Sequence, residues 1–417
     1  MSIATIVRGG SIVMLIALAI QAQQTHNENW TRCSGTDNDL IIAGCTAVIQ
    51  AGGQTPEQQA QIFFKRGLSY VNKKLYDLAI QDFDQALRLN PNADRILFKR
   101  GSVYGAKGQY DRAIQDFDQA LRLSPDDAET LTNRGIAYED KHQYDRAIQD
   151  FDHALRLKPD FEKAFTNRGA SYSGKGQYDR AIQDFDQSIS LDAQDANALS
   201  YRGDAHINLG QYDRAIQDYD QALRLTPDNA ETLTNRGAAY AHKDQYDRAI
   251  QDYDQALRLT PDNAETLTNR GIAYLNKNRY DQAIQDLDHA LRIKPLFAEA
   301  LNHRGAAYIG KGQYDLAIQD LDQAILLNPN DAETLTNRGI CYASKRQYDQ
   351  AILDLDHALR LKPDFDKALN NRGIAYAGKG QYDRAIEDYD QALRLNPNDA
   401  AALSNRRVAY NNKGLKP

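Results

Sequence analysis

The sequence predicts an all-α solenoid, in which antiparallel helix pairs stack along the chain. The 26-residue stretch YDRAIQDYDQALRLTPDNAETLTNRG at 212–237 returns unchanged at 246–271. Glycine recurs every 34 residues from Gly67 to Gly373, and tyrosine follows it three positions later in nine of these ten units. A fixed period of this length indicates stacked repeats, because one helix pair cannot bury its apolar face alone.

Residues 1–22 differ from the rest of the chain. Arg8 precedes the apolar run 12–20, and small and polar residues follow it. This layout is typical of a secretory signal peptide. The apolar run is also too short to span a membrane comfortably. We expect cleavage after Ala19 or Ala22, a periplasmic or secreted protein, and no membrane association after cleavage. The alternative is an uncleaved amphipathic or anchoring helix.

Residues 23–59 are expected to form an N-terminal capping segment with a disulfide between Cys33 and Cys45. Within one helix their Cα atoms would be about 18 Å apart, which is too far for a disulfide. Thr36 and Asp39 resemble a capping box that begins a new helix, so the preceding segment can fold back along it. Such a bridge would stabilise this end by about 3 kcal/mol. The alternative is two reduced thiols.

Residues 60–399 divide into ten units of 34 residues, each predicted to contain two helices. In the third unit, Leu131, Gly135 and Tyr138 share one face of the first helix. Gly135 and Ala147 are small, and we expect the two helices to approach each other closely there. A proline after the second helix ends it in nine units.

The period, with Leu–Gly–Tyr in the first helix and Tyr–Ala–Phe–Ala–Pro in the second, resembles the tetratricopeptide repeat (TPR) family. The resemblance covers residues 60–399 and implies a right-handed superhelical solenoid. Arginine stands before the glycine where the family often has leucine, and we expect it to pair with aspartates of the second helix. Residues 400–417 begin like a first helix but carry Arg407 at the glycine position. They are expected to form a C-terminal capping helix.

The resemblance also implies a concave groove, formed by positions 2, 5, 9, 12 and 13 of each first helix. Position 2 is often acidic and position 5 often threonine. The expected partner-binding residues are Glu129, Thr132, Lys163, Thr166, Asp204, Glu231, Thr234, Glu265, Thr268, Glu299, Glu333, Thr336 and Lys367. Position 5 has no lysine and position 9 no asparagine, unlike members that clamp an acidic carboxyl terminus. We therefore expect a neutral or mildly basic protein or peptide partner, although each position could instead be a solvated helix residue.

Patterns typical of catalysis, metal binding or nucleotide binding do not emerge. The net charge of −7 is spread along the chain, which argues against nucleic-acid binding. The stretch GASYSGKGQ at 169–177 resembles a phosphate-binding loop, but its first glycine lies within a predicted helix. Asp116 and Asp118 would project about 200° apart on a helix and cannot chelate together. We expect Asp118 to pair with Arg122 instead, and we expect no cofactor.

Residues 188–206, named the seam below, depart from the repeat pattern. Ser188 replaces alanine, Ala193 replaces proline, and His206 replaces tyrosine. Drift that leaves a softer joint is the favoured interpretation, and selection for a particular contact is the alternative. Cys341 is expected to be a small core residue.

These patterns together predict an exported, non-enzymatic scaffold or adaptor that binds its partner in the groove. Two alternatives stay open. An accessory subunit of an envelope enzyme or secretion complex would use the same surface. A hydrolase would need paired groove carboxylates with raised pKa values.

Overall fold

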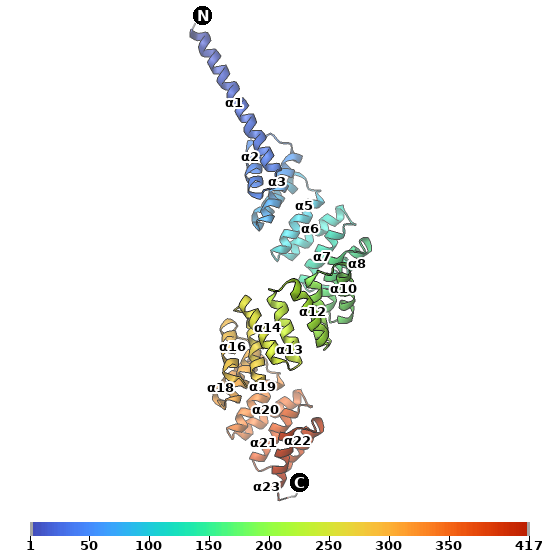
Figure 1. The fold of residues 1–417 in the computed structure, drawn as a ribbon, viewed down its shortest axis with the longest axis vertical. Coiled ribbons are helices and arrows are strands. Elements are labelled where there is room, and N and C mark those ends of the chain that lie inside the picture. The colour runs from blue at the N-terminus through green and yellow to red at the C-terminus, as the bar shows by residue number, and fades with distance from the viewer. Residues whose placement is uncertain (1–2, 415–417) are drawn as a thin grey trace. The chain divides into compact units, whose positions relative to one another are not determined.

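The computed structural model describes residues 3–414, without the side chains of residues 3–13, 15 and 16. These described residues form 23 α-helices and no β-strand (Figure 1). Successive helices pair antiparallel and stack on the next pair, which confirms the all-α solenoid. The chain divides into two compact units, Met1–Ala205 and His206–Pro417.

The helices follow the 34-residue period throughout both units. The first unit contains α1 (Ile3–Ser34), α2 (Asn38–Ala51), α3 (Pro56–Asn72), α4 (Tyr76–Leu89), α5 (Asp94–Ala106), α6 (Tyr110–Leu123), α7 (Ala128–Asp140), α8 (Tyr144–Leu157), α9 (Glu162–Gly174) and α10 (Tyr178–Leu191). The boundary between the units lies within α11 (Ala196–Asn208). The second unit continues with α12 (Tyr212–Leu225), α13 (Ala230–His242), α14 (Tyr246–Leu259), α15 (Ala264–Asn276), α16 (Tyr280–Ile293), α17 (Ala298–Gly310), α18 (Tyr314–Leu327), α19 (Ala332–Ser344), α20 (Tyr348–Leu361), α21 (Asp366–Gly378), α22 (Tyr382–Leu395) and α23 (Ala400–Asn412).

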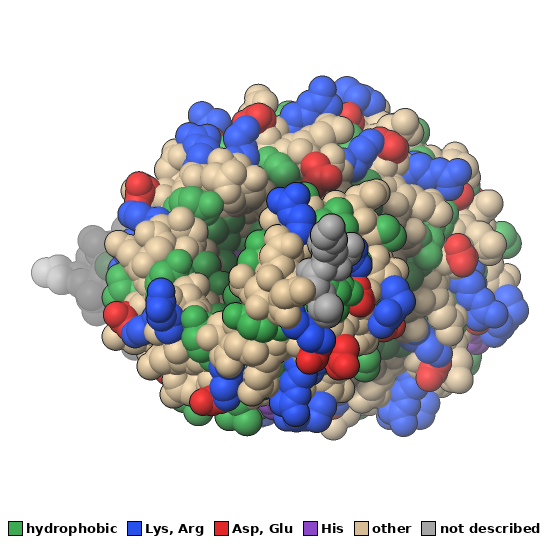
Figure 2. All heavy atoms as spheres, turned by 90° about the horizontal axis from the view of Figure 1, so that it is seen from below, with side chains coloured by type: hydrophobic (Ala, Val, Ile, Leu, Met, Phe, Trp, Pro, Cys, Tyr) green, Lys and Arg blue, Asp and Glu red, His purple; other side chains and the backbone are tan. Residues whose placement is uncertain are grey.

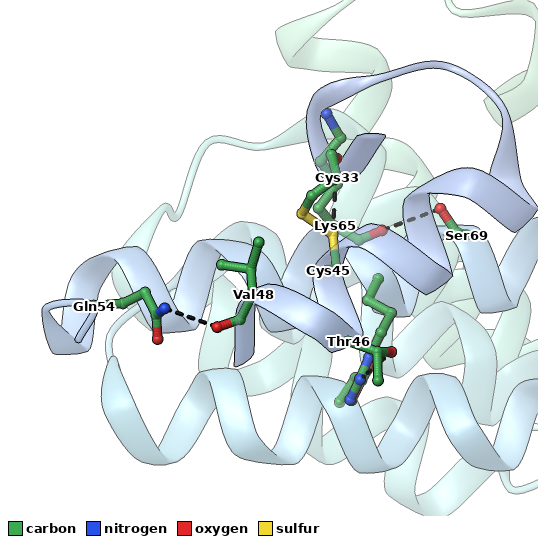
Figure 3. The surroundings of a disulfide bond; sticks show 9 residues. Cys33, Cys45, Thr46, Val48, Gln54, Lys65 and Ser69 are labelled. Carbon is green, nitrogen blue, oxygen red and sulfur yellow. Dashed lines mark hydrogen bonds and ion pairs between the residues drawn. A yellow bond between two sulfur atoms is a disulfide. The ribbon is translucent and has the colours of Figure 1, made fainter. Parts of the chain in front are cut away.

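The predicted disulfide joins the end of α1 to the middle of α2 (Figure 3). The Cα atoms of Cys33 and Cys45 are 4.6 Å apart, and both side chains are buried. The two helices touch closely at Gly44, where a Cβ atom would lie 2.6 Å from the Cys33 backbone nitrogen. One detail of the prediction is wrong, because α2 is capped by Asp37 and not by Thr36. The Asp37 carboxylate accepts a hydrogen bond from the Leu40 backbone N–H at 2.9 Å.

Helix α1 extends through the segment that the sequence predicts to be a signal peptide, residues 1–22. Residues 1–2 of that segment lie outside the described residues. In the part of the chain that the structure describes, no helix is long and apolar enough to cross a membrane. Likewise, residues 415–417 of the predicted C-terminal cap lie outside the described residues.

In nine of the ten repeats, the glycine of the first helix packs against a ring or branched side chain of the second helix. A Cβ atom added to Gly135 would lie 2.6 Å from Cε1 of Phe151. Ala147 is fully buried, which confirms the predicted close approach of α7 and α8. Cys341 takes the expected core position with no exposed surface, and burial raises the pKa of its thiol to about 12.

The turn after each first helix has a residue with positive φ at the same position of the period. Gly176 occupies it after α9 with φ of 71°. Lys175, immediately before it, forms an ion pair with Asp145 on α8. The glycine-rich stretch 169–177 is therefore a helix end and a turn, not a phosphate-binding loop.

The arginine before each glycine connects successive repeats. Arg134 donates from Nε and Nη2 to both carboxylate oxygens of Asp150, at 2.7 and 2.6 Å. Its Nη1 donates to Asp118 of the preceding repeat at 2.7 Å. The pairing expected for these arginines is thus observed, but Asp118 contacts Arg134 and not Arg122. The same three hydrogen bonds recur at Arg100, Arg168, Arg236, Arg270, Arg304, Arg338 and Arg372.

The seam contains a polar cluster that the regular repeats lack. Ser188 is buried, and its hydroxyl lies 2.6 Å from that of Thr166. The Thr166 hydroxyl also donates to Asp195 at 3.0 Å. The Ser188 substitution is thus satisfied by hydrogen bonds instead of leaving an unpaired hydroxyl.

Candidate functional site

Four glutamates at position 2 occupy successive first helices of the second unit. Glu231, Glu265, Glu299 and Glu333 are the second residues of α13, α15, α17 and α19, and all four are exposed. Carboxylates in a first helical turn interact favourably with the helix dipole, which explains part of their occurrence. Among the described residues, none of the four forms an ion pair within 4.0 Å. We name these four residues the acidic row.

Neighbouring groups influence one another along the acidic row. Partial burial of its carboxyl group raises the pKa of Glu299, the charge of Glu265 raises it further, and Lys294 opposes the rise. At the end of the row, burial lowers the pKa of Lys367, while Glu333 opposes this shift. The structure therefore brings two pairs of predicted site residues into electrostatic contact: Glu265 with Glu299, and Glu333 with Lys367.

A histidine that the sequence analysis did not single out lies beside the row. Burial lowers the pKa of His303, at position 6 of α17, to about 4; the charge of Asp331 opposes this shift and that of Lys367 adds to it. His303 is consequently neutral at physiological pH, and adds no positive charge to the row.

The threonines at position 5 lie deeper than the glutamates. Thr132, Thr166, Thr268 and Thr336 are buried, and Thr234 is half-buried. The hydroxyl of Thr268 donates to the Ala264 carbonyl oxygen at 2.8 Å, and that of Thr336 to the Ala332 carbonyl oxygen at 2.7 Å. Because these threonine side chains are buried, they pack between helices. The exposed glutamates of the acidic row are more accessible to a partner.

The two lysines that interrupt the acidic pattern contact asparagines of the preceding repeat. Lys163 donates to the Asn133 Oδ1 atom at 3.4 Å, and Lys367 to the Asn337 Oδ1 atom at 3.1 Å. Asp204, another of the predicted residues, is half-buried on α11. No described group of three or more His, Cys, Asp or Glu residues could hold a metal ion.

In the first unit, Glu129 lines a pocket of about 280 Å³. Arg95, Phe98 and Lys99 of α5 also line it, together with the carboxylates of Asp94 and Asp127. These three residues of α5 are not among the partner-binding residues predicted from the sequence. Phenylalanine at position 5 with lysine at position 6 would have drawn attention to them, since both residues are unusual at those positions of this chain.

A second missed feature lies between α7 and α9. The Glu139 Oε2 atom and the hydroxyls of Ser171 and Ser173 are buried there. Burial raises the pKa of Glu139 to about 7, and the interaction with the Ser171 hydroxyl opposes this rise. This carboxyl group is therefore close to half-protonated near neutral pH.

Charges of both signs are distributed over the rest of the surface. On the face seen in Figure 2, Lys and Arg side chains lie beside Asp and Glu side chains at many points. The periodic ion pairs contribute to this mixture, for example Lys277 with Asp247 at 2.7 Å. The glutamates of the acidic row differ from these paired residues, because none of the four forms an ion pair within 4.0 Å among the described residues.

Comparison with known proteins identifies the repeats. Models of the tetratricopeptide repeat match residues 64–128, 98–162, 132–196, 237–304, 304–370 and 366–399, and a model of the TPR repeat matches residues 203–244. No curated protein matches the chain.

Two solved structures resemble the chain over much of its length. The Cut9–Hcn1 hetero-tetramer of the APC/C contains a chain that is 15% identical with a TM-score of 0.54. The match covers 92% of this chain and 95% of that one. A tetratricopeptide repeat protein from Parabacteroides merdae is 20% identical with a TM-score of 0.50, over 60% of this chain and 98% of that one. At these identities the likeness concerns the fold alone.

Proposed function

Because the chain belongs to the tetratricopeptide repeat family, we propose that it is a non-enzymatic scaffold or adaptor that binds a protein or peptide partner. The acidic row supports this proposal most directly. Four exposed carboxylates repeat at the spacing of the helix pairs, and none of them forms an ion pair within 4.0 Å in the described part of the chain. A neutral or mildly basic segment lying along these helices would supply the missing positive charge or hydrogen-bond donors.

Repetition itself favours binding over catalysis. Each repeat offers a similar modest contact, so affinity is distributed along the row and a long partner gains from several contacts at once. An active site would instead require one position that differs chemically from its neighbours.

We propose in addition that the protein is exported, and works in the periplasm or outside the cell. The disulfide between Cys33 and Cys45 is compatible with an oxidising compartment. The apolar stretch in residues 12–20 is compatible with a cleaved signal. N-terminal sequencing of the protein from the cell envelope tests this, with a new terminus at residue 20 or 23 expected.

Two further functions remain candidates. An accessory subunit of an envelope enzyme or secretion complex would use the same row, and only the identity of its partner distinguishes it from a free adaptor. A hydrolase would need paired carboxylates with a raised pKa, and Glu299 beside Glu265 is such a pair. Turnover lost in a Glu265→Gln/Glu299→Gln variant would favour the hydrolase.

Cross-linking capture from cell-envelope extract tests the scaffold function. One bait is the full chain, and the second replaces the four glutamates of the acidic row with lysine. We expect a partner that is captured by the first bait and lost with the second. A partner retained equally by both baits would place the binding surface elsewhere.

A further inference from the structure

The outer face of α18 differs from that of every other second helix in the ten repeats. Positions of a second helix are counted here from its first residue, which is a tyrosine. Positions 3, 6, 10 and 13 are three or four residues apart and share one side of the helix, named the outer stripe below. On α18 the outer stripe consists of Leu316, Gln319, Gln323 and Leu326, and all four are exposed. Every other second helix carries arginine at position 3, at position 13 or at both.

Two further leucines add to this uncharged surface. Leu353 is at position 6 of α20, where the other repeats have glutamine or glutamate. Leu296 precedes α17, at a place where the other repeats have aspartate, asparagine or glutamine. Leu326, Leu296 and Leu353 are 82%, 75% and 68% exposed, which makes them the three most exposed large apolar side chains of the described residues. Exposed apolar residues that gather in one region mark an interaction surface.

The leucines lie on neighbouring helices of the second unit. Arg338 donates to Asp322 on α18 and to Asp354 on α20, at 2.7 and 2.8 Å, so these two helices are adjacent. Arg304 connects α16 to α18 in the same way. The outer stripes of α16, α18 and α20 therefore belong to one surface.

A contact in the preceding repeat shows where Leu296 lies. There the Nε2 atom of His289, at position 10 of α16, lies 3.0 Å from the Oδ1 atom of Asp262, the residue after the proline. Leu296 and Gln323 hold the equivalent places one repeat later. Leu296 thus lies beside the middle of the outer stripe of α18.

The outer stripe of α18 is complementary to itself. When a second copy faces it with its own α18 antiparallel, position 3 meets position 13 and position 6 meets position 10. Leu316 then packs on Leu326 of the partner subunit, and the amide of Gln319 faces that of Gln323 of the partner subunit. Two amides can satisfy each other, because each carries donors and an acceptor. Leucine, glutamine, glutamine and leucine have the same order from either end of the stripe, which favours a second copy over an unrelated protein.

The flanking helices are compatible with the same arrangement. The two-fold axis runs across the helices, so α16 faces α16 of the second copy and α20 faces α20. Position 3 is Gln282 on α16 and Gln350 on α20, and position 13 is Arg292 and Arg360. Each arginine thus meets a glutamine. On α6, α8, α12, α14 and α22, which carry arginine at both positions, the same pairing would place arginine against arginine.

We propose that the chain forms a symmetric dimer through the outer face of α16, α18 and α20. The interface is isologous, because both copies contribute the same residues. Its centre is the antiparallel pair of α18 helices, and Leu296 and Leu353 extend the apolar contact on either side. The acidic row lies on first helices, so this inference is independent of the proposed scaffold function.

Sedimentation equilibrium of the full chain, from about 1 to about 100 μM, tests the proposal. The test variant, Leu316→Arg/Leu326→Arg, reproduces the outer stripe of α12 and α14, so α18 should still form and pack. The matched control, Leu78→Arg/Ser190→Arg, adds two arginines at the same two positions, which are exposed on α4 and α10. Circular dichroism confirms that both variants are folded.

We expect the wild type to dimerise and the control to match its dissociation constant within about twofold. The test variant should weaken the dimer at least about tenfold, because arginines then face each other across the interface. A third variant, Leu316→Glu/Leu326→Arg, places opposite charges at the facing positions. It should dimerise more tightly than the test variant, with an affinity that falls as salt is added.

A wild type that stays monomeric over the whole range would overturn the proposal, and the leucines would then meet a different protein. Dimerisation of the test variant with wild-type affinity, or an equal loss in the test variant and the control, would overturn it as well. A third variant that dimerises no better than the test variant would contradict the antiparallel pairing of α18.

Discussion

Arg134 and Asp118 belong to different repeats, yet the Nη1 atom of Arg134 lies 2.7 Å from the Oδ1 atom of Asp118. The same guanidinium holds Asp150 of its own repeat with its other two nitrogens. One planar side chain thus joins two successive helix pairs, with the fork geometry that arginine provides and lysine does not. The Asp-X-Asp triplets of the second helices are explained by this arrangement, because their two carboxylates serve arginines of different repeats.

Removing the buried aspartate should cost far more than removing the exposed one. Asp150→Ala leaves the guanidinium of Arg134 partly buried without its bidentate partner, and we expect a loss of about 3–5 kcal/mol. Asp118→Ala removes a more exposed contact and should cost less than about 1 kcal/mol. Hydrogen exchange of α7 and α8, with denaturant unfolding of the full chain, measures both. Equal losses would contradict the assignment of different roles.

Glycines at two positions of α5 and α7 should respond oppositely to alanine. Gly135→Ala places a Cβ atom against Phe151, and should destabilise the chain by about 1–3 kcal/mol. No atom lies within 4 Å of a Cβ atom built on Gly105, so Gly105→Ala should stabilise α5 by about 0.5–1 kcal/mol. Thermal unfolding of the two variants checks this. A stable Gly135→Ala variant would mean that the two helices can move apart.

Reduction of the disulfide should affect only the N-terminal end. Loss of the bridge between Cys33 and Cys45 should destabilise the packing of α1 on α2 by about 3 kcal/mol. Limited proteolysis with and without reductant should then show faster cleavage between residues 30 and 50. A Cys341→Ser variant should respond to reductant as the wild type does. Cleavage at an unchanged rate would show that packing alone holds this end.

The stability of the first unit should depend on the ionisation of Glu139. Its pKa is raised to about 7 in the folded chain, against an ordinary value of 4.5. The folded state therefore binds more protons than the unfolded state between these values, and stability falls as pH rises from about 4.5 to about 7. Glu139→Gln cannot ionise, so its stability relative to the wild type should increase over this range, by up to about 3 kcal/mol. Unfolding at pH 4.5 and pH 8 measures the difference. An equal difference at both pH values would contradict the raised pKa.

The repeat architecture could be predicted from sequence because it depends on local patterns. The glycine that faces Phe151 and the paired arginine recur at the same position of successive repeats. A pattern found in one repeat could therefore be checked in the others. The disulfide could be predicted from helix geometry. The cap residue Asp37 could not, because Thr36 and Asp37 are both good N-cap residues and only the backbone conformation distinguishes them.

The candidate site was less predictable, because exposure depends on how neighbouring repeats pack. Position 5 belongs to the groove by resemblance, but the structure buries Thr132 and Thr336 against neighbouring helices. Arg95 and Lys99 were missed for a related reason. They line one pocket with residues of α6 and α7, and residues so far apart in the sequence come together only when the helices are stacked.

The affinity of a basic peptide for the acidic row tests the central claim most directly. An octapeptide that alternates lysine with leucine is titrated with the wild type and with a variant that replaces Glu231, Glu265, Glu299 and Glu333 by lysine. The matched control carries the same four charge reversals at Asp160, Asp228, Asp364 and Glu387, which are exposed outside the row. We expect the row variant to weaken binding at least about tenfold and the control to change it no more than about twofold, with an affinity that falls as salt is added. Equal binding by the row variant and the wild type would contradict a partner-binding role for these glutamates.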